Sequence, residues 1–94
     1  MAAVFSEKKL HRIDRLDKIV KDFFEENPNI REIAAKDLMP LFIKKGIFLQ
    51  DHRNGFPIRI LLNELNREGM LQLFRHIKVE RRAEESAWYF TRTL

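Results

Sequence analysis

The chain has 94 residues, which predicts one small domain with a single modest core. It is 45% hydrophobic and 34% charged, a composition typical of globular proteins rather than disordered ones. It has no cysteine, which excludes disulfide bonds, thiol catalysis and cysteine-ligated zinc.

No apolar run in the sequence is long enough to span a bilayer. The opening stretch MAAVFSEKK leads into no long apolar region of the kind that a secretory signal contains. We therefore expect a cytoplasmic or nucleoid-associated protein that is not secreted.

The positive charge of the chain is small and unevenly placed. The formal net charge is +4, from 18 basic and 14 acidic side chains, and residues 1–30 carry six of each. The basic excess therefore lies in residues 31–94. An excess of this kind is compatible with an anionic partner such as nucleic acid, and it also occurs in proteins that bind none.

The first predicted helix covers residues 7–26, with Ser6 as its N-cap. Its apolar residues have helical spacing and spread over roughly half of the circumference, wider than the usual stripe of about 100°. They are Leu10, Ile13, Leu16, Ile19, Val20, Phe23 and Phe24. The sequence ENPN then ends the helix.

A second helix is predicted over residues 38–45. Pro40 would cost about 3 kcal/mol in a helix interior, but Asp37 as N-cap places it in the first turn, where no donor is lost. Gly46 is a natural stop after the helix. Residues 30–36 fit a short helix or an extended stretch equally well.

The third predicted helix covers residues 57–69. Asn54-Gly55 is also a hairpin-turn signal, so a hairpin over 47–60 is the alternative. Pro57 suits the first turn of a helix better than a strand. The apolar residues also keep helical spacing rather than alternation, and they are Ile58, Leu61, Leu62 and Leu65.

After Gly69 the apolar period changes to alternation, which predicts a β-hairpin with strands 71–82 and 87–93. The polar stretch RRAEES between the strands is typical of a hairpin tip. A single hairpin is marginally stable, so it must pack on the helices. Trp88 is predicted to be its anchor on the core.

This order of elements resembles the winged helix-turn-helix superfamily, most closely over residues 37–92. In LLNELNREGML, four residues match the LxxLxxxGxL pattern that ends the family's third helix, and YFTRT resembles the closing wing strand. The matching residues are Leu62, Leu65, Gly69 and Leu71. The resemblance implies an α+β fold of three helices and a C-terminal hairpin wing. One departure is the connection over 47–56, where a helix-turn-helix usually has a few residues.

The resemblance implies a DNA-binding protein, either a small transcriptional regulator or an accessory DNA-binding factor. Arg59, Asn63 and Arg67 share the outer side of the third helix. Arg can donate two hydrogen bonds to guanine, and Asn can pair with adenine in the same bidentate way. The residues expected at double-stranded DNA are Arg59, Asn63 and Arg67 at bases, and Arg53, Lys44, Lys45, Arg81 and Arg82 at the backbone or an adjacent groove.

Two other interpretations are open. The stripe on the third helix is equally well explained as a solvated helix face, and Glu64 and Glu68 beside it would oppose phosphates. Winged helices also serve as protein–protein interaction modules without DNA binding. The broad apolar arc of the first helix and the segment GIFL at 46–49 favour that use, and the first helix could also form a homodimer.

No enzyme is expected. His11, His52 and His76 have no metal-ligand spacing, and the three scattered glycines form no phosphate-binding loop. The sequence indicates no cofactor, no metal and no small-molecule substrate.

Overall fold

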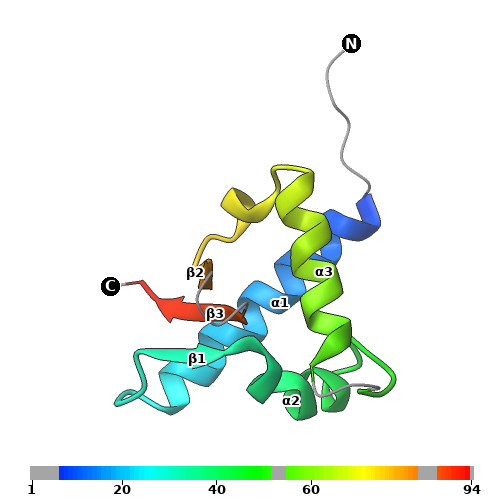
Figure 1. Cartoon of the computed structure of the whole chain (residues 1–94). Helices are drawn as coiled ribbons and strands as arrows, with labels where there is room; N and C mark the ends of the chain where they lie inside the picture. Colours follow the sequence, from blue (N-terminus) through cyan, green and yellow to red (C-terminus); the bar gives the residue numbers. More distant parts are fainter. Residues whose placement is uncertain (1–6, 52–54, 83–86, 94) are drawn as a thin grey trace.

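The structure, a computed structural model, describes residues 7–51, 55–82 and 87–93 (Figure 1). Ser6, the predicted N-cap of the first helix, lies outside the described residues. In chain order the elements are α1 (Glu7–Glu26), β1 (Glu32–Ala34), the 3-10 helix η1 (Ala35–Leu38), α2 (Met39–Lys44), α3 (Phe56–Arg67), the 3-10 helix η2 (Leu71–Leu73), β2 (Ile77–Arg82) and β3 (Ala87–Arg92).

The three strands form one antiparallel sheet in the order β1-β3-β2. β2 and β3 pair from Ile77 opposite Arg92 to Arg82 opposite Ala87. β1 pairs with the other edge of β3. Of the two alternatives for residues 30–36, a short helix or an extended stretch, the structure has the extended one at residues 32–34. The α+β class is confirmed, and the order of elements is compatible with a small winged-helix-like fold.

The core lies where the helices meet one face of the sheet. It draws four residues from α1, four from α3 and the inward-facing residues of the hairpin, because the apolar spacing of each element places them on one side. α1 crosses the molecule beside the sheet and α3 (Figure 1). The least exposed large side chains are Phe42, Phe90, Leu16, Met39, Ile58, Leu62, Leu65, Met70 and Val20.

The broad apolar arc of α1 is largely used by this core. Ile13, Leu16, Val20 and Phe24 are buried, and Ile19 and Phe23 are half-buried against the core. Leu10 remains 39% exposed.

One of the two local predictions about the start of α2 differs from the structure. Asp37 is not the N-cap of α2, because a 3-10 turn continues to Leu38, which occupies the cap position without a side-chain hydrogen bond. Pro40 does lie in the first turn of α2, as expected. The prediction of the proline position therefore stands without its predicted cap.

The first hairpin strand begins at Ile77 and not at 71. Gly69 has φ +70°, and the Met70 N–H donates to the Leu65 carbonyl at 2.9 Å, which ends α3 two residues before the predicted end. Met70 is then buried, and the chain makes a 3-10 turn. Leu71 and Leu73 lie in this turn. Their spacing of two residues is the same as in a strand, which is why the sequence predicted a strand from residue 71.

A buried carboxylate joins α1 to the beginning of β2. Asp17 is 2% exposed, and its Oδ1 accepts hydrogen bonds from the backbone N–H groups of Arg75 (3.1 Å) and His76 (2.9 Å). Its Oδ2 lies 2.5 Å from Nδ1 of His76. These contacts satisfy a charge that would otherwise be costly to bury.

The long connection between α2 and α3 is held at both ends. Ile47 is buried, and the ring of Phe48 packs edge-on against that of Phe42, with 6.3 Å between the ring centroids. Both carboxylate oxygens of Asp51 accept from the Gly55 N–H, at 2.8 and 2.9 Å. α3 therefore starts from a fixed point, directly after Gly55, and the alternative hairpin over 47–60 is not formed.

None of the described helices is long and apolar enough to cross a membrane.

Gly55→Ala is expected to destabilise the fold more than Gly69→Ala. Both glycines have positive φ, which costs an L-residue about 1–2 kcal/mol. A Cβ at Gly55 would also lie 2.4 Å from Cβ of Lys36, whereas nothing lies within 4 Å of one at Gly69. In urea unfolding, Gly55→Ala should lower the free energy of unfolding by at least about 1 kcal/mol more than Gly69→Ala does. Equal losses would contradict the close packing against η1.

Asp17→Ala is expected to lower the free energy of unfolding by about 2–4 kcal/mol, because the backbone N–H groups of Arg75 and His76 lose their acceptor and two part-buried hydrogen bonds disappear. Asp14→Ala is the matched control. Asp14 is exposed, and its single ion pair within the described ranges is the i,i+4 contact with Lys18 at 3.7 Å, so its loss should cost about a few tenths of a kcal/mol. Similar losses in both variants would show that Asp17 has no special structural role.

Candidate nucleic-acid interface

The outer side of α3 presents two exposed arginines one above the other. Arg59 and Arg67 are both exposed, two helical turns apart. The guanidinium of Arg59 lies 5.3 Å from the ring centre of Phe56, which supports the side chain beside the helix start. In the described part of the chain Arg67 makes no side-chain hydrogen bond or ion pair. Its donors are therefore available to an anion.

Asn63, between these arginines, has a partner inside the protein. It is half-buried, and its amide oxygen accepts a hydrogen bond from Nε1 of Trp88 at 2.9 Å. Bidentate pairing with adenine needs both the oxygen and the amino group of the amide. Such pairing would have to break the bond to Trp88, so Asn63 in this geometry joins α3 to β3.

The hairpin separates Arg81 from Arg82. Arg81 is opposite Trp88 in the register, and cross-strand partners point to the same face of a sheet. Arg81 therefore lies on the sheet face that meets α3, and it is exposed. Arg82, the next residue, lies on the opposite face.

Arg82 is occupied by neighbours on that opposite face. Its guanidinium bonds Glu32 of β1 at 2.6 Å and Glu80 at 3.0 Å, and it lies 3.8 Å from the ring centre of Tyr89. The hydrogen bond to Glu32, followed by the one to Glu80, raises the pKa of Arg82 above its usual value. The same contact with Arg82 lowers the pKa of Glu32. Arg82 thus links β1 to the hairpin and is less available to DNA than Arg81.

The two lysines at the end of α2 are exposed. Neither the Lys44 nor the Lys45 ammonium has a hydrogen-bond or ion-pair partner among the described residues. The carbonyl of Lys45 accepts a bond from Nη2 of Arg15 at 2.6 Å, which fixes the end of the helix and leaves both ammonium groups in solvent. Arg53, the other predicted backbone contact, lies outside the described residues.

Glu64 of α3 and Glu68, the C-cap residue of this helix, are paired with α1. Nζ of Lys9 lies 3.1 Å from Glu64 and 2.6 Å from Glu68. The hydrogen bond to Glu68, followed by the one to Glu64, raises the pKa of Lys9. On the helix wheel Glu64 lies about 60° and Glu68 about 100° from Arg67. The Lys9 ammonium therefore reduces the repulsion that Glu64 and Glu68 would exert on phosphates.

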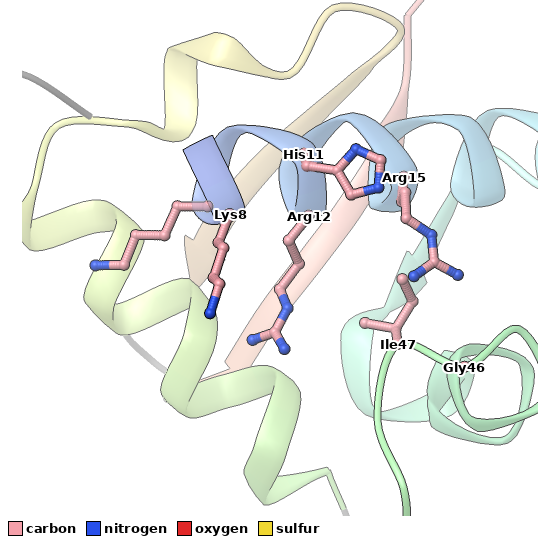
Figure 2. Close-up of a pocket in the computed structure, with 7 residues that line it drawn as sticks. Lys8, His11, Arg12, Arg15, Gly46 and Ile47 are labelled. Atoms are coloured by element: carbon pink, nitrogen blue, oxygen red, sulfur yellow. The ribbon is translucent and has the colours of Figure 1, made fainter. Parts of the chain in front are cut away.

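A second basic feature lies on α1, which contributes none of the residues predicted from the sequence to bind DNA. Lys8, Lys9, His11, Arg12 and Arg15 line an open pocket together with Gly46 and Ile47 (Figure 2). α1 carries six basic and six acidic residues, so its summed charge of zero conceals this grouping. The spacing of the basic residues in KKLHRIDR was the available signal, since positions three and four apart share a helix face.

No family model, no curated protein and no solved structure matches this chain. Among the described residues no group of three or more His, Cys, Asp or Glu side chains could hold a metal ion.

Asn63→Ala is expected to lower the free energy of unfolding by about 1–3 kcal/mol, because the buried indole N–H of Trp88 loses its acceptor. Trp88 is the one tryptophan of the chain, so its fluorescence reports both the local change and unfolding in urea. Asn66→Ala, at an exposed position of α3, is the control and should leave the emission spectrum unchanged. An unchanged spectrum and stability in Asn63→Ala would contradict the role assigned to this bond.

Proposed function

We propose that this protein binds double-stranded DNA through the outer side of α3. The observation that carries the proposal is that Arg59 and Arg67 are exposed and form no hydrogen bond or ion pair with the other described residues, while Lys9 holds the neighbouring Glu64 and Glu68. Arginine at such a position can donate two hydrogen bonds to a guanine edge or bind phosphate. The polar side of α3 would then lie in the major groove.

The supporting contacts come from outside α3. Lys44 and Lys45 extend from the end of α2, and Arg81 lies on the sheet face that meets α3. Cations in these places would contact phosphates and fix the register of α3 without reading sequence. Asn63 takes a positioning role in this proposal, because its bond to Trp88 sets the hairpin against α3. Arg82 contributes to the sheet rather than to the DNA surface.

A small regulator or accessory DNA-binding factor is the activity that fits such a surface. The alternative is a protein-interaction module without DNA binding. Its specific support is Leu49, which is 96% exposed in the connection between α2 and α3, and Ile60, which is 46% exposed on α3. Large apolar side chains in solvent are typical of interfaces when they form a continuous patch. Homodimer formation through α1 has weaker support, because most of its apolar arc is buried in the core.

Fluorescence anisotropy with a random-sequence DNA duplex tests the proposal. Five cationic contacts predict that affinity falls by about two to three orders of magnitude between roughly 50 and 200 mM salt, because bound counter-ions are released. Arg59→Ala and Arg67→Ala should each weaken binding about tenfold and reduce the salt slope by about 1.

Lys78→Ala is the matched control for charge. Lys78 is exposed on the sheet face that points away from α3, so its loss should change affinity less than about twofold. If the protein does not bind at the lower salt, the proposal is wrong and the protein-interaction module becomes the better explanation. Equal losses in Lys78→Ala and Arg59→Ala would show non-specific attraction rather than an α3 interface.

A further inference from the structure

The pocket beside α1 combines a small-ligand volume with a lining of one charge sign. Its volume is about 340 Å³, at the lower end of the range of about 300–1,000 Å³ for small-molecule sites. Of the seven described residues that line it, five are basic and none is acidic. The other two, Gly46 and Ile47, belong to the connection after α2.

The helix periodicity explains why these side chains converge. Lys8, Arg12 and Arg15 lie four and three residues apart, so they share one face of α1. Figure 2 shows Arg12 and Arg15 extending from α1 toward the side on which Gly46 and Ile47 lie. Like charges at this spacing repel one another and destabilise a helix, and a bound anion would offset that repulsion.

The side chains that line the pocket are partly fixed in position. Nη2 of Arg15 donates to the Lys45 carbonyl, which leaves the other guanidinium N–H groups free to bind. The guanidinium of Arg12 lies 5.9 Å from the ring centre of Phe48. Lys9 is held by Glu64 and Glu68, so the cations available to a ligand are chiefly Lys8, Arg12 and Arg15. Two guanidinium groups and one ammonium suit a phosphate or diphosphate group, which accepts several charge-assisted hydrogen bonds.

We propose that the pocket formed by α1 and the Gly46–Ile47 segment binds a small molecule through its phosphate or diphosphate group. This inference does not depend on DNA binding by α3. The two surfaces use different cations, so each proposal can fail without the other.

The test is a titration of the full-length, ¹⁵N-labelled protein with inorganic pyrophosphate at constant ionic strength, followed by backbone amide chemical shifts. Saturable shifts are expected at Lys8, Arg12, Arg15, Gly46 and Ile47. Lys8→Gln and Arg12→Gln should each raise the Kd for pyrophosphate about five- to tenfold. Lys78→Gln removes one positive charge from the outer face of the sheet and should change the Kd for pyrophosphate less than twofold. The spectra of the variants also verify that each is folded.

Shifts that rise linearly without saturation, or that spread over all basic residues, would overturn the proposal, as would an equal loss in Lys78→Gln. A parallel titration with duplex DNA distinguishes the source of the phosphate. DNA should leave the pocket resonances unmoved and should still bind in Lys8→Gln and Arg12→Gln. If DNA shifts these resonances and pyrophosphate does not saturate them, the pocket holds the DNA backbone and the small-ligand proposal is wrong. If pyrophosphate still binds to Arg59→Ala and Arg67→Ala, the pocket is a separate site from α3, and a failure of DNA binding would not count against it.

Discussion

The buried carboxylate of Asp17 fixes the position of α1, and both candidate binding surfaces depend on that position. By accepting the N–H groups of Arg75 and His76, it holds the middle of α1 against the segment that enters β2. Arg92 makes a second attachment, because its guanidinium donates to backbone carbonyls of Phe24, Asn27 and Ile30 near the end of the helix. The helix is thus joined to both strands of the hairpin by polar contacts as well as by its apolar face.

With α1 held in this way, its N-terminal half reaches two other parts of the fold. Lys9 contacts the acidic residues of α3, and Arg15 caps the carbonyl end of α2. The helix therefore acts on the electrostatics of α3 although it carries no net charge itself. This arrangement shows why the summed charge of a segment is a poor guide to function. What matters is which partner each charge meets, and that is decided by tertiary packing.

Much of the fold could be predicted because the information was local. The helical spacing of Ile58, Leu61, Leu62 and Leu65, with Pro57 in the first turn, was enough to place α3 and to reject a hairpin at Asn54-Gly55. The alternation of the apolar Trp88 and Phe90 with Tyr89 and Thr91 likewise predicted the strand β3. β1 could not be predicted in this way, because three residues are too few to show a period. Its pairing with β3 comes from a segment almost sixty residues away in the sequence.

The candidate site was harder to predict for the same reason. Exposure of Arg59 and Arg67 follows from the helix wheel, since they lie opposite the apolar side. The occupation of Asn63 by Trp88, and of Arg82 by Glu32, depends on contacts across 25 and 50 residues of sequence. The alternation that separates Arg81 from Arg82 could have been read from the sequence, because adjacent residues of a strand point to opposite faces and Arg81 has the parity of Ile77 and Val79.

Lys9 gives the two proposed surfaces a physical connection. It lines the α1 pocket, and it also neutralises Glu64 and Glu68 on α3. An anion that drew the Lys9 ammonium into the pocket would leave two carboxylates unpaired beside the arginines of α3, and these would repel DNA phosphates. Thermodynamic linkage makes this effect reciprocal, so DNA bound to α3 would lower the affinity of the pocket for the anion by the same factor. If both surfaces bind their ligands, the geometry at Lys9 therefore favours opposition between them rather than cooperation.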